Sequence, residues 1–480
     1  MILLSDNNFI NSILNLLNIT NDFLWTYIII GLLIFSALYF TIRTRGVQFV
    51  LFKDMIRIMM GRDKKKEKIP QDKTTAKYIS SFGAFTVSLS SRVGTGNLAG
   101  VASAIFVGGP GAVFWMWIMA LLGAATAFVE STLAQLYKRR GKDSFYGGPA
   151  YYMQKGLHRK WMGVVFAILI TTTFGMAYQV IQSNTLCDSL SDAIGIDKIP
   201  IGIILTISIL VIIFGGIQRI TNFSNMIVPA MTLGYLLLAL YIVFTNIDLL
   251  PSVFKQIIDG AFGLEQITGG TLGAAMMQGI KRGLFSNEAG EGSAPNAAAV
   301  ADTSHPVKQG LVQALGVFID TLIICTCTAF IILVSGAYTS GVDGILLTTK
   351  AIESQVGEWG KYFMTAAIFL FAYSTIIGNY FYGEANIRFI TKKGIAVTIF
   401  RIITGGVVMI GAIVSLQTAW SFADIMMGLM TLFNLVAILL LSNKVFFLLR
   451  NYISQKKAGK EPEFRRNMMP EIEKDIECWD

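Results

Sequence analysis

The chain has 480 residues, of which 54% are hydrophobic and only 14% charged. A soluble domain carries about 25% charged residues, so this composition excludes an ordinary water-exposed surface and predicts an all-α polytopic membrane protein. The two histidines, His158 and His305, and the four cysteines do not have the spacing of a zinc site or a disulfide framework, which argues against metal-based catalysis. The net charge of +9 comes mainly from basic residues beside apolar runs, a pattern that indicates membrane orientation rather than nucleic-acid binding.

Apolar runs long enough to cross a bilayer recur along the whole chain. We expect eleven transmembrane helices, at residues 23–42, 78–106, 111–137, 161–186, 199–215, 224–245, 270–301, 308–337, 359–388, 396–416 and 420–449. The first run has no basic leader or small-residue cleavage site, so it is expected to be a span rather than a signal peptide. Residues 49–60, 251–262 and 344–356 are expected to lie along the membrane surface.

Basic residues follow alternate spans. The loop at residues 43–77 contains a lysine cluster, further Lys and Arg follow the third, fifth, ninth and eleventh spans, and the opposite loops carry mainly acidic residues. The positive-inside rule then predicts a cytoplasmic loop at 43–77 and a cytoplasmic tail at 450–480. Residues 1–42 would be an extracellular N-terminus and an extra helix, and the location would be the plasma membrane.

Two spans contain interruptions that a straight, lipid-facing helix would not tolerate. The second span reads Ser-Ser-Arg-Val-Gly-Thr-Gly-Asn at residues 90–97, and the seventh has charged and glycine-rich residues at 279–293. Because the seventh span opens a second set of five, residues 78–246 and 247–449 are expected to form two five-helix halves of opposite orientation. An inverted 5+5 repeat with two broken helices is typical of secondary transporters.

A broken helix leaves backbone amides and carbonyls without partners inside the membrane. The amides attract a carboxylate and the carbonyls attract a cation. Gly94 and Gly96 let the backbone approach a ligand, and the side chain of Asn97 can ligate a hard cation. Glycines in membrane helices usually serve close packing, but packing does not explain why Arg92 and Thr95 surround them. The polarity of the break fits a zwitterionic amino acid together with Na⁺.

The seventh span also carries charges that are close enough to pair across its break, as structural or gating ion pairs. They are Lys281, Arg282, Glu288 and Glu291. In the ninth span, Ser374 and Thr375 are adjacent hydroxyls, although such residues often bond only to their own backbone.

Residues 108–123, Gly-Gly-Pro-Gly-Ala-Val-Phe-Trp-Met-Trp-Ile-Met-Ala-Leu-Leu-Gly, resemble the signature of the alanine-or-glycine:cation symporter family. Residues 94–102 and 282–290 are also similar to that family, and the resemblance extends from the first span to the last. It implies sodium-coupled uptake of small neutral amino acids. It also implies the five-plus-five inverted-repeat fold of the amino acid and neurotransmitter:sodium symporters, with one extra helix before the ten-helix core.

The resemblance also implies site residues. The amides of Thr95 and Gly96 would hold the substrate carboxylate, and Ile280 would belong to an apolar wall with two aromatic residues. From its position in the fourth span, Gln182 could either reach a substrate or bridge neighbouring helices. The full expected substrate set is Gly94, Thr95, Gly96, Asn97, Gln182, Ile280, Phe369 and Tyr373. A Na⁺ site would use the carbonyls of Ser90, Val93 and Phe371 with the hydroxyls of Ser374 and Thr375, and Asn97 would face a second cation.

The sequence leaves three other functions open. Proton coupling through Glu288 or Glu291 is the alternative within transport. A channel is less expected because of the paired breaks, and a membrane-embedded enzyme would need a cluster of His, Asp or Cys at bilayer depth. We therefore expect a symporter and not an enzyme, with L-alanine or glycine, Na⁺ and the lipid bilayer as partners.

Overall fold

The computed structural model describes residues 19–61, 79–141, 144–263 and 272–479. In these ranges eight continuous helical segments are long and apolar enough to cross a membrane. They are Ile19–Arg43, Gly111–Leu136, Lys160–Ile194, Gly216–Thr245, Pro306–Ser335, Trp359–Ile390, Gly394–Gly411 and Ala419–Lys457. Polytopic membrane architecture is therefore confirmed.

The three other predicted spans are also helical, but each is short or interrupted. The second consists of α5 (Ser81–Arg92), a π-turn η2 (Gly96–Gly100) and α6 (Val101–Gly108), and the fifth is α11 (Lys198–Ile213). The seventh consists of α14 (Leu272–Asn287) and α15 (Ala294–Ala299). Helices thus occupy all eleven predicted ranges, while eleven crossings and a 5+5 repeat stay predictions.

The uninterrupted predicted spans contain the remaining long helices. In chain order these are η1 (Trp25–Ile29), α2 (Ile30–Arg43), α7 (Gly111–Leu136), α9 (Lys160–Thr172), η3 (Thr173–Ala177), α10 (Tyr178–Ile194), α12 (Gly216–Thr245), α16 (Pro306–Val317), η5 (Phe318–Cys325), α17 (Thr326–Ser335), α19 (Trp359–Ile390), α20 (Gly394–Gly411) and α21 (Leu416–Lys457).

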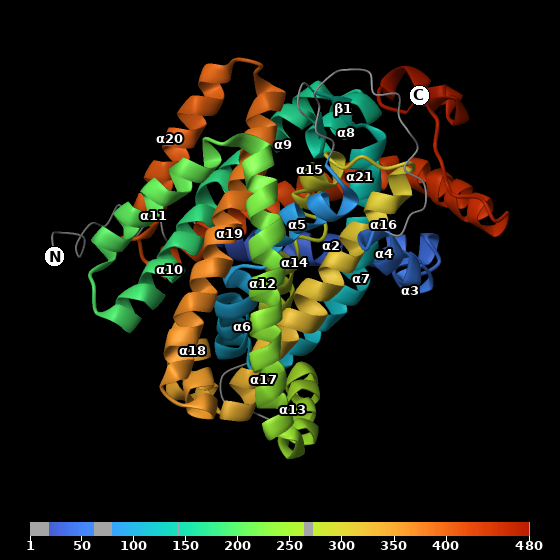
Figure 1. Ribbon diagram of the computed structural model, residues 1–480. Coiled ribbons are helices and arrows are strands. Elements are labelled where there is room, and N and C mark those ends of the chain that lie inside the picture. The colour runs from blue at the N-terminus through green and yellow to red at the C-terminus, as the bar shows by residue number, and fades with distance from the viewer. Residues whose placement is uncertain (1–18, 62–78, 142–143, 264–271, 480) are drawn as a thin grey trace.

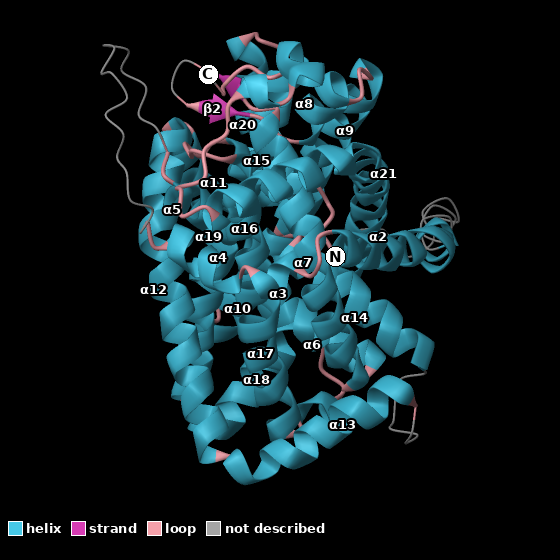
Figure 2. Ribbon diagram, turned by 90° about the vertical axis from the view of Figure 1, so that its right-hand side faces the viewer, coloured by secondary structure: helices cyan, strands magenta, loops and turns pink. Residues whose placement is uncertain are grey.

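Short elements complete the chain. They are α3 (Val47–Val50), α4 (Phe52–Met59), β1 (Arg139–Arg140), β2 (Phe145–Tyr146), α8 (Pro149–Gly156), η4 (Ile247–Leu249), α13 (Leu250–Phe262), η6 (Ala337–Ser340), α18 (Gly344–Val356), η7 (Arg466–Met468) and η8 (Pro470–Asp475). Helices α4, α13 and α18 occupy the three segments expected along the membrane surface, and that placement stays a prediction. Figure 1 shows α13, α17 and α18 at one end, with α8 and the C-terminus at the other, and Figure 2 shows the same separation from the side.

Two sets of helices pack most closely among themselves. In the first set α7 packs against α14 and α16, and in the second α10 and α9 pack against α19 while α11 packs against α20. Small residues permit the close approach in the first set: a Cβ added at Gly310 of α16 would lie 2.7 Å from the carbonyl oxygen of Phe128 of α7. Helix α5 contacts both sets, through α16 of the first and α19 of the second.

Candidate functional site

A side chain caps the backbone at the first break. Helix α5 ends at Arg92, and the Asn97 carboxamide oxygen accepts a hydrogen bond from the amide of Gly94 at 2.9 Å. All residues of this segment are buried. Asn97 therefore satisfies one of the amides that the interruption leaves without a helical partner.

The next amide points to a polar side chain of another helix. The amide of Thr95 donates to the Oε1 atom of Gln182, on α10, at 3.1 Å. The Thr95 hydroxyl is buried and has no hydrogen-bond partner within the described part of the chain. A carboxamide oxygen thus occupies the place where the sequence predicts a substrate carboxylate, next to an unsatisfied hydroxyl that would be costly without a ligand.

The predicted Na⁺ ligands come together where α5 ends. The Thr375 hydroxyl, on α19, donates to the carbonyl of Ser90 at 2.9 Å and contacts the carbonyl of Val93 at 3.3 Å. The neighbouring Ser374 hydroxyl donates to the carbonyl of Phe371 at 3.0 Å. A Cβ at Gly94 would overlap the Thr375 hydroxyl, so only glycine permits this approach. The oxygen-only donor set suits a hard cation.

A second polar cluster surrounds Asp320 of η5, a residue that the sequence reasoning missed. Its carboxylate accepts hydrogen bonds from Asn97 at 2.7 Å, from Ser286 at 2.7 Å and from Thr321 at 2.9 Å. Asp320 is fully buried, and no Lys or Arg of the described residues lies within 4 Å of it. An intramembrane carboxylate is a signal of function, and that signal was present in the sequence.

Aromatic rings cover the break on the side of α14. The ring of Phe285 packs edge-on against Tyr178 at 4.6 Å and against Trp420 at 4.7 Å between centroids. The same ring limits the space at the break, because a Cβ at Gly96 would lie 2.9 Å from it. These rings confine any ligand at Thr95 and Gly96 to a small volume.

The charges of the seventh span do not pair with one another as expected. Arg282 forms a two-point ion pair with Asp424 of α21 at 3.0 and 3.1 Å, and Lys281 lies 3.8 Å from the same carboxylate. Helix α14 continues to Asn287, so Lys281 and Arg282 lie on it before the break and face α21. The guanidinium also stacks on Trp420 at 3.9 Å, which offsets part of the cost of burial.

The second break contains buried carboxylates instead. Glu288 has a positive φ of 58° and accepts hydrogen bonds from Ser91 and Ser293, each at 2.6 Å. Glu291 lies 3.4 Å from the Tyr178 hydroxyl, and Glu130 of α7 accepts from Asn434 at 2.7 Å. Within the described residues no Lys or Arg lies within ion-pair distance of these three carboxylates.

Two predicted wall residues, Phe369 and Tyr373, lie apart from the first break, while the place of Ile280 in the wall stays a prediction. Phe369 stacks on Tyr373 at 5.4 Å, and Tyr373 packs against Phe223 of α12. At about 100° per residue, Tyr373 lies on the face of α19 opposite to Thr375, so a helix that turns Thr375 toward α5 turns Tyr373 away. Phe369 is 39% exposed, and Ile280 is buried within α14.

Sequence comparison identifies relatives along almost the whole chain. The sodium:alanine symporter family model matches residues 10–466. The probable sodium/glutamine symporter GlnT of Bacillus subtilis is 47% identical, over 97% of this chain and 96% of that protein. The amino-acid carrier protein AlsT of the same organism is 48% identical, over 98% of each chain. Its putative sodium/proton-dependent alanine carrier protein YrbD is 41% identical, over 92% of this chain and 93% of that one.

Solved structures with a similar fold are distant in sequence. A Na⁺-coupled sialic acid symporter, in a substrate-bound outward-open state, has a TM-score of 0.51 and 15% identity over 92% of this chain and 94% of that one. A mutant manganese transporter of Eremococcus coleocola has a TM-score of 0.52 and 14% identity over 87% and 88% of the two chains. They support a transporter fold and nothing finer. The chain therefore belongs to the sodium:alanine symporter family, and it is a cation-coupled amino-acid transporter rather than an enzyme.

Proposed function

We propose that the protein is a Na⁺-coupled symporter that takes up small neutral amino acids, alanine or glycine, by alternating access across the plasma membrane. The observation that carries the proposal is the meeting of Thr375 with the carbonyls of Ser90 and Val93, beside the Thr95 amide. Oxygen donors for a cation and an amide for a carboxylate thus belong to one broken helix. A zwitterion and a cation are the ligands that such a break favours.

The substrate carboxylate would replace the carboxamide oxygen of Gln182 at the Thr95 amide, and the Thr95 hydroxyl would gain a partner. The Thr375 hydroxyl would turn its proton away from the carbonyls of α5, and its oxygen would bind Na⁺ together with those carbonyls. Bound Na⁺ would then link α5 to α19 more strongly in one of the two states of the transporter than in the other. Only such a difference in affinity lets a ligand shift the equilibrium between two states.

The space beside Gly96 supports a small side chain. The Phe285 ring faces this glycine and is itself held by Tyr178 and Trp420. Alanine and glycine fit this restriction better than glutamine, the substrate in the name of one relative. Larger side chains would require the three rings to move.

The Asp320 cluster supports a second cation site. Its carboxylate binds Asn97, whose own oxygen supports the break, so a cation at Asp320 would be coupled to the shape of the substrate site. A buried, unpaired carboxylate is costly unless it binds a cation or a proton.

Proton coupling is the second candidate, because three buried carboxylates lie near the second break without an ion-pair partner in the described chain. Glu130, Glu288 and Glu291 are hydrogen-bonded only to neutral groups. Two relatives carry names that mention both sodium and proton dependence.

Equilibrium binding of radiolabelled alanine to the purified protein, with and without Na⁺, tests the proposal. We expect Na⁺-dependent binding that glycine displaces and that glutamine and larger amino acids displace weakly. Gly96→Ala should abolish it, because the added Cβ meets the Phe285 ring, whereas Gly100→Ala should retain it, because its nearest neighbour lies at 4.0 Å. Equal binding in the absence of Na⁺ would contradict Na⁺ coupling, and displacement by glutamine at the same concentration as glycine would contradict the size restriction.

A further inference from the structure

The segment that follows α21, residues 458–479, returns to the end of the bundle that carries α8 and α15 (Figure 1). We call it the C-terminal strap. Three of its apolar side chains, Phe464, Ile476 and Trp479, are 4% exposed or less. Such burial is unusual for a chain terminus, which is ordinarily poorly ordered unless it is tied down.

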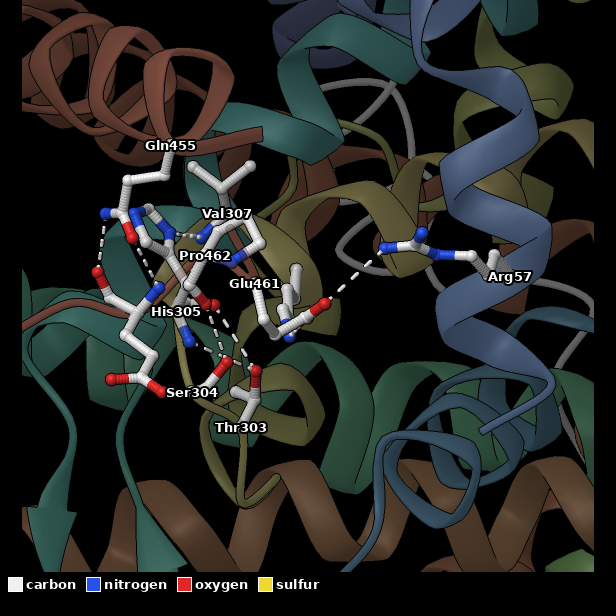
Figure 3. Close-up of polar contacts among 10 residues, drawn as sticks. Arg57, Thr303, Ser304, His305, Val307, Gln455, Glu461 and Pro462 are labelled. Carbon is white, nitrogen blue, oxygen red and sulfur yellow. Dashed lines mark hydrogen bonds and ion pairs between the residues drawn. The ribbon is translucent and has the colours of Figure 1, made fainter. Parts of the chain in front are cut away.

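One part of the strap binds the turn between α15 and α16. The amide of Phe464 donates to the carbonyl of Ser304 at 2.9 Å, and the Ser304 hydroxyl donates to the carbonyl of Pro462 at 2.8 Å. Glu461 pairs with Lys308 at the start of α16 and lies 3.8 Å from Arg57 of α4. Figure 3 shows Ser304, Pro462, Glu461 and Arg57 in this arrangement.

The other part of the strap binds the end of α7. The indole of Trp479 donates to the carbonyl of Gln135 at 3.0 Å. The ammonium of Lys138 lies over the Trp479 ring at 4.5 Å and donates to the carbonyl of Ala301 at 3.0 Å. Glu477 pairs with Arg139 at 2.6 Å. The strap therefore joins the ends of two helices of the first set.

The same region holds the start of the broken helix. Ile79, two residues before α5, forms a bridge with Ala301, and the amide of Asp302 donates to the carbonyl of Ile79 at 2.9 Å. An open cleft of about 610 Å³ lies between α4, the start of α5 and residues 302–304. Any widening of the path beside α5 at this end has to separate groups that the strap and this bridge hold together.

The strap also connects the two helix sets. It is covalently continuous with α21, which packs against α9 and α10 of the second set and also against α7 and α16 of the first. Its hydrogen bonds and ion pairs reach α7, α16 and the turn before α16, on the side of the first set. Asp475 of the strap also lies 3.6 Å from His158, which precedes α9 of the second set. A relative movement of the two sets at this end would therefore pull the strap away from one of them.

We propose that the C-terminal strap is a latch that keeps this end of the transport path, predicted to be cytoplasmic, closed and that undocks when the end opens. This inference rests on the alternating-access transport proposed above. The ion pairs of Glu461 with Arg57 and of Glu477 with Arg139 involve partly exposed side chains, which are weak and are screened by salt. A latch of a few buried side chains and weak ion pairs can release without unfolding the bundle.

The native Cys478 reports whether the strap is docked. It lies next to Trp479, and burial raises the pKa of its thiol to about 11, so the docked thiol reacts slowly. Labelling with a membrane-impermeant maleimide is measured on the full chain in inside-out membrane vesicles. Mass spectrometry of the Cys478 peptide separates it from Cys187, Cys325 and Cys327.

Two matched pairs of variants test the latch. Glu461→Gln removes the partner of Lys308 and Arg57, while Glu463→Gln removes a strap charge that forms no ion pair among the described residues. Trp479→Ala removes the anchor at α7, while Trp359→Ala removes an indole that is 53% exposed at the start of α19. We expect E461Q and W479A to raise the Cys478 labelling rate at least about tenfold, and E463Q and W359A to leave it unchanged, since the rate follows the fraction of undocked strap.

The second readout is the exchange of labelled for unlabelled alanine in proteoliposomes, with the melting temperature of the purified protein as the control for folding. We expect faster exchange in E461Q and W479A at an unchanged melting temperature. Unchanged labelling would overturn docking, and faster labelling with unchanged exchange would overturn the latch. Absence of alanine exchange in the wild type would count against the proposed function, while the labelling rates would still report docking of the strap.

Discussion

Thr375 connects two helices through a single oxygen atom. Its hydroxyl contacts the carbonyls of Ser90 and Val93, and its methyl and Cβ atoms leave no room for any residue but glycine at position 94. The neighbouring Ser374 returns to its own helix at the carbonyl of Phe371. Removing both hydroxyls takes two of the five proposed ligands from the cation and leaves the carbonyls in place.

We expect the double variant S374A/T375A to need at least about tenfold more Na⁺ for half-maximal alanine binding, because a lost ligand to a charged group costs about 1.5–3 kcal/mol. Thr365→Val is the matched control, since the Thr365 hydroxyl, on the same helix, bonds only to the carbonyl of Lys361. A titration of alanine binding with Na⁺ measures the effect. The Na⁺ site is in the wrong place if the double variant titrates like the wild type.

At the residue level, sequence reasoning found the polar groups of the first break but not all of their partners. Gln182 was expected to reach a substrate or a neighbouring helix, and it binds the Thr95 amide. Asp424 was missed as the partner of Arg282 because the two lie 142 positions apart, and helix periodicity carries no information on contacts between distant helices. Asp320 was missed although a lone carboxylate in an apolar run was a sufficient signal.

At the scale of the elements, the two interruptions were predicted from glycine and charge content, and both are present. The second begins later than expected, since α14 continues through Lys281 and Arg282 to Asn287. The ion pair with Asp424 and the stacking on Trp420 explain the difference, because they compensate charges that would otherwise end a helix in the membrane. Only the tertiary contact decides where such a helix breaks.

Docking of the C-terminal strap is expected to depend on pH because the strap covers His305, at the start of α16. Its Nδ1 atom accepts the amide of Val307, its Nε2 atom faces Asn451, and the rings of Tyr452 and Phe464 cover it. Burial and, to a smaller extent, the positive charge of Lys308 lower the pKa of His305 to about 3. Lys308 in turn forms an ion pair with Glu461 of the strap. Docking of the strap therefore requires the neutral imidazole.

The undocked state would return His305 toward its ordinary pKa of 6.5 and bind a proton below that value. The free energy of docking is therefore most favourable above pH 6.5. It becomes less favourable as the pH falls from 6.5 toward 3, by at most about 1.4 kcal/mol per pH unit. We expect Cys478 labelling, divided by that of W479A at the same pH, to rise up to about tenfold between pH 7.5 and 5.5. The variant H305Q should remove the rise, and a ratio that stays constant in the wild type would contradict this role of His305.

On the scale of the whole molecule, apolar length and charge asymmetry predicted helices at all eleven ranges, and eight of them are long and apolar enough by themselves to cross a membrane. The docking of residues 458–479 was not predictable, because the tail is polar and its few anchors, such as Trp479, have no periodicity. The basic cluster of Lys64, Lys65, Lys66 and Lys68 lies outside the described residues. Its predicted cytoplasmic position stays a prediction, as does the orientation of both termini.

In the proposed mechanism, Na⁺ drives the accumulation of a small zwitterion. The direct measurement is alanine uptake into proteoliposomes at a clamped membrane potential, with either an inward Na⁺ gradient at equal pH or an inward proton gradient without Na⁺. We expect accumulation above the external concentration with the Na⁺ gradient and only equilibration with the proton gradient. Accumulation driven by the proton gradient in the absence of Na⁺ would contradict this mechanism and would assign the coupling to the buried carboxylates Glu130, Glu288 and Glu291.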